Sequence, residues 1–352
     1  MKRNTTEFTV LPSYHGDCII IKTFDIHNDE FIILIDGGTA QTFRYSLKAE
    51  LKNINHIDLL ILTHIDSDHI AGLINFFKSS LIDSIIIDEI WMNHPEIVEV
   101  NNDNLISTKQ GDTLKELILS KKPNVKLLEV STNETSILRQ GIEFIILSPT
   151  QQIKDELYNK WQLSSLPKAN NDNVNISSQK EVYSSSLLDL NKIEFIPDKS
   201  INGDIYNSSS IAFILKCLDI TILLLADARP EVITESLKLN GYSETQPLKV
   251  DYVKVSHHGS LNNTSQEMLG LIKCNDFIIS TNGGTAVHKF PSRETIARIV
   301  YSSQRNDEEL NIYFNYKIEE IKERIGDFID DLDFNEGNWN VITKNWFGKN
   351  DI

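Results

Sequence analysis

Short runs of apolar and β-branched residues alternate with polar, turn-forming segments along most of the chain, a pattern typical of strands in a folded domain. The strands predicted from these runs cover residues 8–11, 18–22, 31–35, 57–62, 85–92, 125–130, 143–147, 210–217, 220–225, 250–255, 277–280 and 310–316. Helical spacing predicts helices over residues 43–52, 70–77, 108–120, 230–239, 265–272 and 292–302. Two strand-rich blocks with helices between them predict a layered α/β sandwich but do not fix its topology.

Composition separates one strand-rich domain from two polar segments. Residues 151–203 are rich in Asn, Ser, Gln and Lys and show little periodicity, so we expect a long inserted loop or a partly ordered flap. Residues 317–333 are strongly acidic. We therefore expect a single domain over residues 1–305, with the polar insert inside it. Residues 306–352 are expected to form an acidic C-terminal extension that is packed on the domain or appended to it.

Length and composition favour a cytoplasmic protein without a membrane partner. The chain has 352 residues, 40% of them hydrophobic, which is enough for a sizeable core. No stretch approaches the roughly 18 to 20 consecutive apolar residues of a membrane span, and the first ten residues lack the apolar core of a signal peptide. Cys18, Cys217 and Cys274 lie in apolar runs without CxxC spacing, so they are interpreted as core residues of a reducing compartment.

The net charge restricts the partners. The chain has 34 Lys and Arg against 50 Asp and Glu, which gives a formal charge of −16. There is no run rich in Lys and Arg, and such a field repels a polyanion. The charge therefore argues against tight, unaided binding of nucleic acid, while a small nucleotide or a polymer presented by a partner stays compatible with it.

The segment His64-x-Asp66-x-Asp68-His69 is the first candidate for chemistry. It leaves an apolar strand and enters a helix, so alternate side chains share a face and His69 can join them where the chain turns. Four ionisable groups at the end of an apolar strand are costly unless they are compensated, and a divalent cation is the simplest compensation. The alternative is a solvated acidic loop with two incidental histidines, which four metal-ligand residue types in six positions make the weaker interpretation.

A second cluster, His257-His258-Gly259-Ser260, also follows an apolar strand. A lone histidine pair is weak evidence, but together with the first cluster it indicates a metal site. Asp227 ends a third apolar strand, and from the sequence it is either the N-cap of the helix that follows or a metal ligand.

The order of these motifs resembles that of the metallo-β-lactamase superfamily. The resemblance rests on an apolar strand with Asp36-Gly37-Gly38, then on the first cluster, then on Asp227, and finally on the histidine pair. More narrowly, the chain resembles the metallo-hydrolase domain of ComEC-type DNA-uptake proteins and their free-standing relatives, in which an aspartate stands at the position of Asp66. The motifs at Gly16-Asp17, Asn207-x-x-Ser210 and His288-x-x-Pro291 are similar to that branch as well. The resemblance covers about residues 5–305 and implies an αββα sandwich of two mixed β-sheets flanked by helices.

The resemblance also implies roles for individual residues. His64 and Asp66 would hold one metal ion, Asp68 and His69 a second, and Asp227 would bridge both. One of His257 and His258 would complete a coordination sphere; the sequence does not decide between them, and the position before the glycine favours His258. Asp36 would accept a hydrogen bond that orients a ligand imidazole, and Asn207 would support the ligands from behind. Asp68 would orient or deprotonate the attacking water, and His288 would donate to the leaving group. Ser260 and Thr264 would contact the phosphate. His288 could equally be an ordinary surface histidine.

The chain departs from the superfamily at one ligand. The separate histidine that usually lies between the first cluster and the bridging aspartate has no counterpart, because there is no histidine between His94 and His257. The site is therefore richer in oxygen ligands than usual. We expect two divalent ions, zinc or manganese with magnesium as a further candidate, and occupancy by one ion stays open.

Three functions are compatible with these residues. The favoured one is a metal-dependent phosphodiesterase or nuclease that acts on nucleotides or nucleic acid through a metal-activated water. The second is a hydrolase of esters, lactones or thioesters, because one fold hosts many chemistries. The third is a metal-stabilised component of a multi-protein complex, with a partner from a neighbouring gene and defence as one setting.

Overall fold

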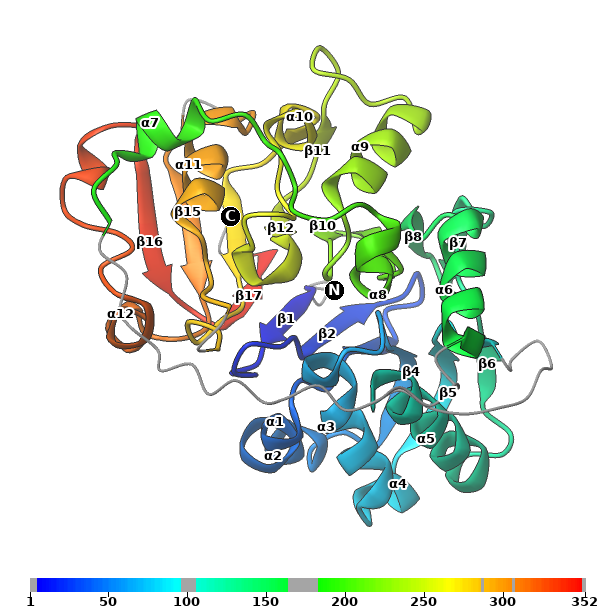
Figure 1. The fold of residues 1–352 in the computed structure, drawn as a ribbon. Coiled ribbons are helices and arrows are strands. Elements are labelled where there is room, and N and C mark those ends of the chain that lie inside the picture. Colours follow the sequence, from blue (N-terminus) through cyan, green and yellow to red (C-terminus); the bar gives the residue numbers. More distant parts are fainter. Residues whose placement is uncertain (1–4, 96–105, 164–182, 286–287, 306–307, 350–352) are drawn as a thin grey trace.

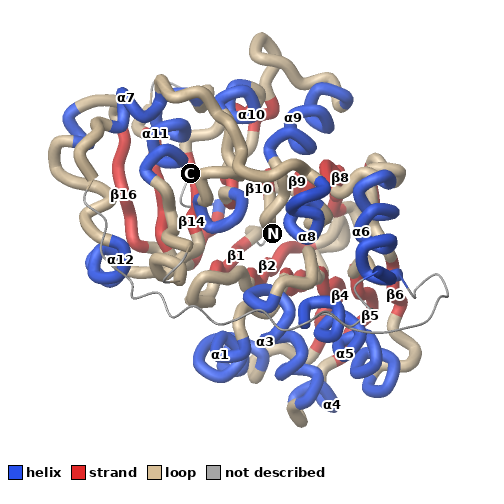
Figure 2. The backbone as a smooth tube through the Cα atoms, viewed as in Figure 1, coloured by secondary structure: helices blue, strands red, loops and turns tan. Residues whose placement is uncertain are grey.

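Two large β-sheets lie against each other, and helices cover both outer faces (Figure 1). The computed structural model describes residues 5–95, 106–163, 183–285, 288–305 and 308–349. Figure 2 shows the strands between a lower set of helices around α3 and α5 and an upper set around α9 and α11. The predicted αββα sandwich is therefore confirmed.

The first sheet has seven strands in the order β17-β1-β2-β3-β4-β5-β6. Its strands are β1 (Glu7–Val10), β2 (Ile19–Phe24), β3 (Glu30–Ile35), β4 (His56–Ile61), β5 (Ile86–Trp91), β6 (Lys126–Leu128) and β17 (Trp346–Gly348). β3, β4, β5 and β6 are parallel neighbours. The helices from the same part of the chain are α1 (Ala40–Thr42), α2 (Lys48–Leu51), α3 (Ser67–Lys78), α4 (Leu81–Ser84) and α5 (Ile106–Lys121), with a π-helical turn at Phe43–Leu47.

The second sheet has eight strands in the order β16-β15-β14-β12-β10-β9-β8-β7. Its strands are β7 (Ser136–Arg139), β8 (Ile142–Ser148), β9 (Ala212–Lys216), β10 (Thr221–Leu224), β12 (Tyr252–Lys254), β14 (Asp276–Ile279), β15 (Leu310–Phe314) and β16 (Trp339–Thr343). The remaining elements are the small pair β11 (Leu248–Lys249) and β13 (Ile272–Lys273), the helices α6 (Gln151–Leu163), α7 (Leu187–Asn191), α8 (Ile205–Ser208), α9 (Pro230–Leu239), α10 (Gln266–Gly270), α11 (Arg293–Ser302) and α12 (Ile318–Ile325), and short 3-10 turns at Asn202–Asp204, Ser256–Gly259 and Asp333–Asn335.

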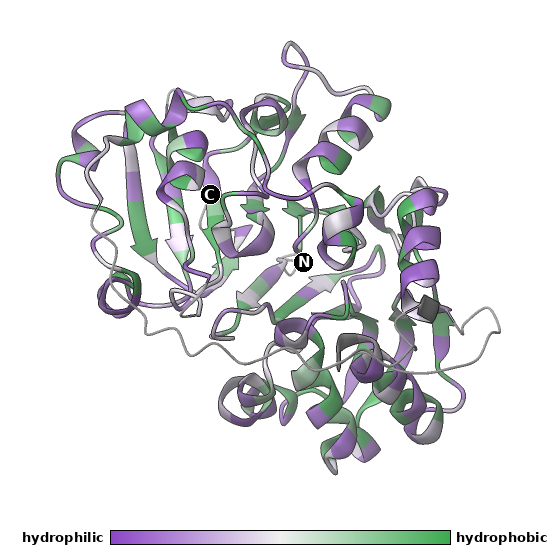
Figure 3. Cartoon of the chain, viewed as in Figure 1, coloured by the Kyte–Doolittle hydropathy of each residue, from purple (hydrophilic) through white to green (hydrophobic). Residues whose placement is uncertain are grey.

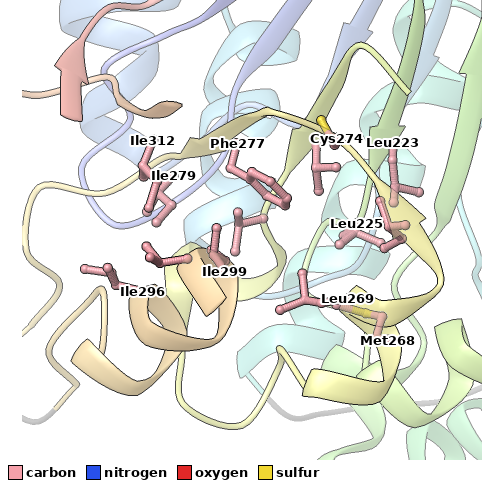
Figure 4. Packing of buried hydrophobic residues seen from close by; sticks show 14 of the residues in the cluster. Leu223, Leu225, Met268, Leu269, Cys274, Phe277, Ile279, Ile296, Ile299 and Ile312 are labelled. Carbon is pink, nitrogen blue, oxygen red and sulfur yellow. The ribbon is translucent and has the colours of Figure 1, made fainter. Parts of the chain in front are cut away.

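The core is divided into three layers by the two sheets. The middle layer lies between the sheets and is rich in aromatic residues such as Phe8, Trp91 and Phe213. One outer layer joins the first sheet to α3 and its neighbours, and the other joins the second sheet to α10 and α11. Figure 4 shows the second of these, where Ile296 and Ile299 of α11 face Phe277 and Ile279 of β14. Colouring by hydropathy accordingly shows mainly apolar strands between helices that alternate apolar and polar faces (Figure 3).

The polar insert is more regular than its composition predicts. Residues 151–163 form α6, and Ile153, Leu157 and Trp161 pack into the core beside the first sheet. The prediction of a loop from residue 151 is wrong, because these three apolar residues recur at the spacing of one helix face within a segment that is otherwise mostly polar. Residues 164–182 of the predicted insert lie outside the described part of the chain.

The C-terminal segment supplies strands to both sheets. β15 pairs with β14, β16 pairs with β15, and β17 pairs with β1 at the edge of the first sheet. The composition predicts an extension over residues 306–352, whereas the strands described there are built into the sandwich itself. The acidic stretch contains α12, whose buried Ile321 and Ile325 face the core. Among the described residues, no helix is long and apolar enough to span a membrane.

Truncation of Phe277 tests the packing of the outer layer. The Phe277→Ala variant removes a fully buried ring from the contact between β14 and α11, and we expect a loss of about 3 to 5 kcal/mol in the free energy of unfolding. The half-exposed Phe334 provides the matched control, because Phe334→Ala should cost much less. Denaturant unfolding followed by circular dichroism measures both, and equal losses in the two variants would contradict the described packing.

Candidate metal centre

The candidate residues lie at one edge of the sandwich, where strands from both sheets end. Asp36 follows β3 and His64 follows β4, and these two strands are parallel. Asp227 follows β10 and His257 follows β12, which are also parallel to each other. Because the carboxyl ends of parallel strands meet at one edge of a sheet, each sheet contributes one half of the cluster.

Glycines allow the turn after β3 to pack closely against α3 in the first half of the cluster. A Cβ atom on Gly72 of α3 would lie 1.8 Å from the carbonyl oxygen of Gly37, and Gly37 N donates a hydrogen bond to His69 O over 2.8 Å. The Asp36-Gly37-Gly38 turn therefore lies directly on the first turn of α3. Only residues without a side chain allow this approach, and it brings Asp36 next to His69.

Asp66 stands at the N-cap position of α3, but its side chain makes no capping hydrogen bond. Its carboxylate is about one-third exposed, and Asp68 in the first turn is 22% exposed. These two carboxylates lie on the accessible side of the cluster, whereas His64 and His69 are buried.

The second half of the cluster is held in a strained turn. His257 and His258 both have left-handed backbone angles, with φ of 45° and 56°, and Ala226 beside Asp227 has φ of 46°. Such angles are unfavourable for residues with a Cβ atom and persist where the surrounding structure fixes them, often at functional sites. Here His257 N donates to Ala226 O over 2.8 Å, which ties the histidine turn to the Asp227 turn.

The carboxylate of Asp227 is the centre of the arrangement. Its Oδ2 atom lies 3.5 Å from His69 Nε2, 3.6 Å from His257 Nε2 and 3.8 Å from His64 Nε2. Its Oδ1 atom lies 3.7 Å from His258 Nε2. Asp227 does not cap the following helix, because α9 begins at Pro230 with Arg229 at the N-cap position. The capping alternative from the sequence is therefore wrong.

The four imidazole rings are oriented from behind by protein acceptors. His69 Nδ1 lies 2.8 Å from Asp36 Oδ2, and His258 Nδ1 lies 2.9 Å from the carbonyl oxygen of Ser280. His64 Nδ1 lies 3.1 Å from Thr63 Oγ1, whose hydroxyl donates to Asp36 Oδ2.

Asn263 orients the fourth ring in the same way. The distance from His257 Nδ1 to Asn263 Oδ1 is 3.0 Å. With a partner behind each ring at Nδ1, all four imidazoles turn their Nε2 atoms toward Asp227, which is the arrangement typical of metal-bound histidines.

The unpaired atoms of the cluster fit a divalent cation. Within the described residues, the buried Nε2 atoms of His64, His69 and His258 and the Oδ1 atom of Asp227 have no hydrogen-bond partner. Their separations of 3.5 to 3.8 Å exceed the roughly 2.7 to 3.2 Å of a hydrogen bond. They are close to the roughly 3.3 Å between ligands that sit about 2.0 Å from one zinc ion in a tetrahedron. Two groups of this cluster have their three ligand atoms within 4.8 Å of one another, one formed by His64, His69 and Asp227 and the other by Asp68, His69 and His258; a third group of this kind among the described residues, His56, Asp58 and Asp88, lies outside the cluster.

Burial shapes the ionisation of these groups. It lowers the pKa of His64 well below the usual value and lowers the pKa of His258 as well, which favours the neutral, ligating form of both rings. Burial opposes the charge of His69 too, but Asp227 and Asp36 outweigh it and raise the pKa of that imidazole. Partial desolvation within the cluster and the neighbouring Asp68 raise the pKa of Asp66 to about 7.

A buried ion pair lies directly behind His258. Lys254 Nζ bonds Asp17 Oδ2, and both side chains are almost completely buried. Asp17 Oδ1 lies 3.6 Å from His258 Nδ1. The pair joins β12 of one sheet to the turn before β2 of the other, and a Cβ atom on Gly16 would lie 1.8 Å from Asp68 O. Lys254 therefore ties the two halves of the cluster together.

The remaining candidate residues lie around the cluster. Asn207 is buried and its amide donates to Asp204 Oδ1 over 3.1 Å, while the neighbouring Ile211 N donates to Thr63 O. Ser260 and Thr264 are buried next to the histidine turn. His288 is exposed and stacks on Phe290 with ring centroids 6.4 Å apart, and Phe290 in turn contacts His257 and His258.

Three residues of the site, Asn263, Ser280 and Lys254, were not predicted from the sequence. Lys254 could have been identified from the sequence, because a lysine inside the apolar run 250–255 needs a buried partner. Asn263 and the carbonyl of Ser280 could not have been identified, since an isolated asparagine and a backbone carbonyl have no distinguishing sequence pattern.

The family comparison agrees with the first half of the site. A family model of the metallo-beta-lactamase superfamily matches residues 14–150, which include Asp36 and the first cluster. Together with the two mixed sheets flanked by helices, this match supports a relationship of the chain to the metallo-β-lactamase superfamily. None of the curated proteins matches the chain.

Solved structures of this fold are only distantly similar. The metallo-beta-lactamase fold protein YhfI from Bacillus subtilis is 11% identical, with 98% of this chain and 99% of that chain covered and a TM-score of 0.38. Zn(2+)-bound PqqB from Methylobacterium extorquens is 9% identical, with 97% and 99% covered and a TM-score of 0.41. A long form of RNase Z from yeast is 12% identical, with 89% and 41% covered and a TM-score of 0.35. These values are too low to bear on activity.

Removal of Lys254 tests the ion pair behind His258. The Lys254→Met variant leaves Asp17 buried without its partner, and breaking a buried pair typically costs about 3 to 5 kcal/mol of stability. The double variant Asp17→Asn/Lys254→Met removes the stranded charge, so it should recover part of this loss. Thermal and denaturant unfolding measure both, and a single variant as stable as the parent would contradict the pairing.

Proposed function

We propose that the chain is a metal-dependent hydrolase that cleaves phosphodiester bonds in nucleotides or nucleic acid by means of an activated water. The observation that carries the proposal is the convergence of buried, partnerless imidazole nitrogens on the Asp227 carboxylate. A solvated acidic loop would not bury these nitrogens, and a purely structural cluster would pair them.

The distances support a division of the proposed ligands between two ions. His64 and Asp66 lie together on the Oδ2 side of Asp227, with 3.9 Å between His64 Nε2 and Asp66 Oδ2. His258 lies between Asp227 Oδ1 and Asp68 Oδ2, at 3.7 and 3.8 Å. By distance His69 belongs to both groups, because its Nε2 atom lies 3.5 Å from Asp227 Oδ2; following the resemblance, we place it with Asp68 in the second group. These residues would hold two divalent cations, zinc or manganese, with Asp227 shared between the two groups.

His257 takes the place of the histidine ligand that the chain lacks. Its Nε2 atom lies 3.6 Å from Asp227 Oδ2, the same oxygen that faces His64. The ring is 23% exposed, so it borders the accessible side of the site as Asp66 does. In this assignment both members of the histidine pair are ligands, one for each ion, and Asn263 is a positioning residue for His257.

The residues on the accessible side perform the chemistry. A pair of bound divalent ions lowers the pKa of water and stabilises the charge that develops on a phosphoryl oxygen. The carboxylate of Asp68 is positioned to orient the attacking water and to accept its proton. The ring of His288 stacks on Phe290, which in turn contacts His257. In this proposal His288 donates a proton to the leaving oxygen of a substrate that lies across Phe290.

Loss of a central ligand should abolish both metal binding and hydrolysis. We expect His64→Ala and Asp227→Ala to lose nearly all bound metal and at least about 1000-fold in kcat on bis-p-nitrophenyl phosphate, because each removes a ligand from the centre. Elemental analysis and phosphodiesterase assays with added manganese or zinc measure the effect. His27→Ala, at an exposed turn, is the matched control and should behave as the parent. Full activity in either ligand variant would refute the proposal.

Replacement of Asn263 tests the role of His257. Asn263→Leu has a similar volume but cannot accept the proton of His257 Nδ1, so we expect the weaker-bound ion to lose about 10- to 100-fold in affinity. Asn263→Asp keeps the acceptor and should restore most of this affinity. Metal titration by calorimetry compares the two variants, independently of turnover. Equal metal affinity in Asn263→Leu and the parent would exclude His257 as an oriented ligand.

A further inference from the structure

A cavity of about 460 Å³ lies beside the histidine turn, and none of the proposed metal ligands lines it. Its lining includes Tyr183, Ser260, Leu261, His288 and Phe290. The volume lies within the roughly 300 to 1,000 Å³ of pockets that enclose a small organic ligand. It is too small for a duplex.

Phe290 connects the cavity to the metal centre. Its ring lies 5.3 Å from that of His257 and 5.9 Å from that of His258, and it also lines the cavity. The wall is fixed to the histidine turn, because Ser292 N donates to Gly259 O over 2.9 Å and a Cβ atom on Gly259 would lie 2.6 Å from Pro291 Cβ. A substrate whose phosphorus lies at Asp227 would therefore extend over the ring of Phe290 and place its remaining part in the cavity.

The charges of the cavity favour an uncharged group over a second phosphate. Lys289 and Arg293 line it together with Asp198 and Glu294, and once Arg293 is paired with Asp333 the two acidic side chains outnumber the remaining basic one, which disfavours a second phosphate. Arg293 is held by both oxygens of Asp333, at 2.7 and 2.8 Å, so its charge is already compensated. The rest of the lining combines hydroxyl groups with the rings of Tyr183 and Phe290, which suits a sugar and a base that can stack on an aromatic face.

We propose that this cavity binds the nucleoside part of a single nucleotide ester, so that the substrate is a small nucleotide phosphodiester and not a nucleic-acid polymer. This inference rests on the proposed phosphodiesterase function. The formal charge of −16 agrees with it, because a small ester carries few of the phosphates that this field repels.

Two p-nitrophenyl esters separate the nucleoside contribution from the chemistry. Thymidine 5′-(p-nitrophenyl phosphate) and methyl p-nitrophenyl phosphate release the same leaving group and differ only in the group that would occupy the cavity. We expect the thymidine ester to have at least a 10-fold higher kcat/KM, mainly through KM. The Leu261→Trp variant fills the cavity and should remove this preference while hydrolysis of the methyl ester is unchanged. Leu239→Trp, on the exposed end of α9, is the matched control.

Binding of thymidine 5′-monophosphate to the metal-loaded protein is measured in parallel by calorimetry. Binding that is lost in Leu261→Trp supports the inference, even if neither ester is hydrolysed and the proposed function fails. Equal rates for the two esters, with no effect of Leu261→Trp on rate or binding, would overturn the inference and leave the phosphodiesterase proposal standing. Preferential cleavage of single-stranded DNA that is insensitive to Leu261→Trp would overturn it as well.

Discussion

The architecture of the site depends on one buried carboxylate. Asp227 is almost completely inaccessible and lies among four imidazole rings, two from each half of the sandwich. A buried negative charge is costly unless a positive charge or hydrogen bonds compensate it. The surrounding rings direct their Nε2 atoms toward it, but at 3.5 to 3.8 Å they are farther away than the partners of a normal hydrogen bond. The pair of cations that we propose would satisfy the carboxylate and the imidazoles together.

The remainder of the sandwich keeps these groups at fixed positions. Close glycine contacts hold the Asp36 turn on α3, and left-handed backbone angles hold His257 and His258. The Asp17–Lys254 pair joins the two sheets behind the cluster. Each of these features costs conformational or desolvation energy, which the three apolar layers offset. The cluster is therefore preorganised, because the buried Nε2 atoms of His64, His69 and His258 and the Oδ1 atom of Asp227 have no hydrogen bond to lose before a cation binds.

Much of this arrangement could be predicted from the sequence. The ends of apolar strands locate Asp36, His64, Asp227 and the histidine pair, because ionisable side chains that gather at the end of a buried run need a compensating partner there. The helix α6 could also have been predicted from the spacing of Ile153, Leu157 and Trp161.

Other features depend on contacts between distant segments and leave no local pattern. β16 and β17 are short strands whose pairing with β15 and β1 is set by the tertiary structure. The amide of Asn263 and the carbonyl of Ser280 act on histidines through the same kind of contact. The cavity beside Phe290 combines residues 183–190, 260–262 and 288–294 with Asp198, so its volume and charge become visible only in the fold.

The most direct test of the central claim is anomalous X-ray diffraction from crystals grown with manganese or zinc. We predict two anomalous peaks about 3.5 to 4 Å apart, on either side of the Asp227 carboxylate. One of them should be bound by His64, Asp66 and His257, and the other by Asp68, His69 and His258. Crystals without an anomalous peak at Asp227, at saturating metal, would contradict the claim that this cluster is a metal centre.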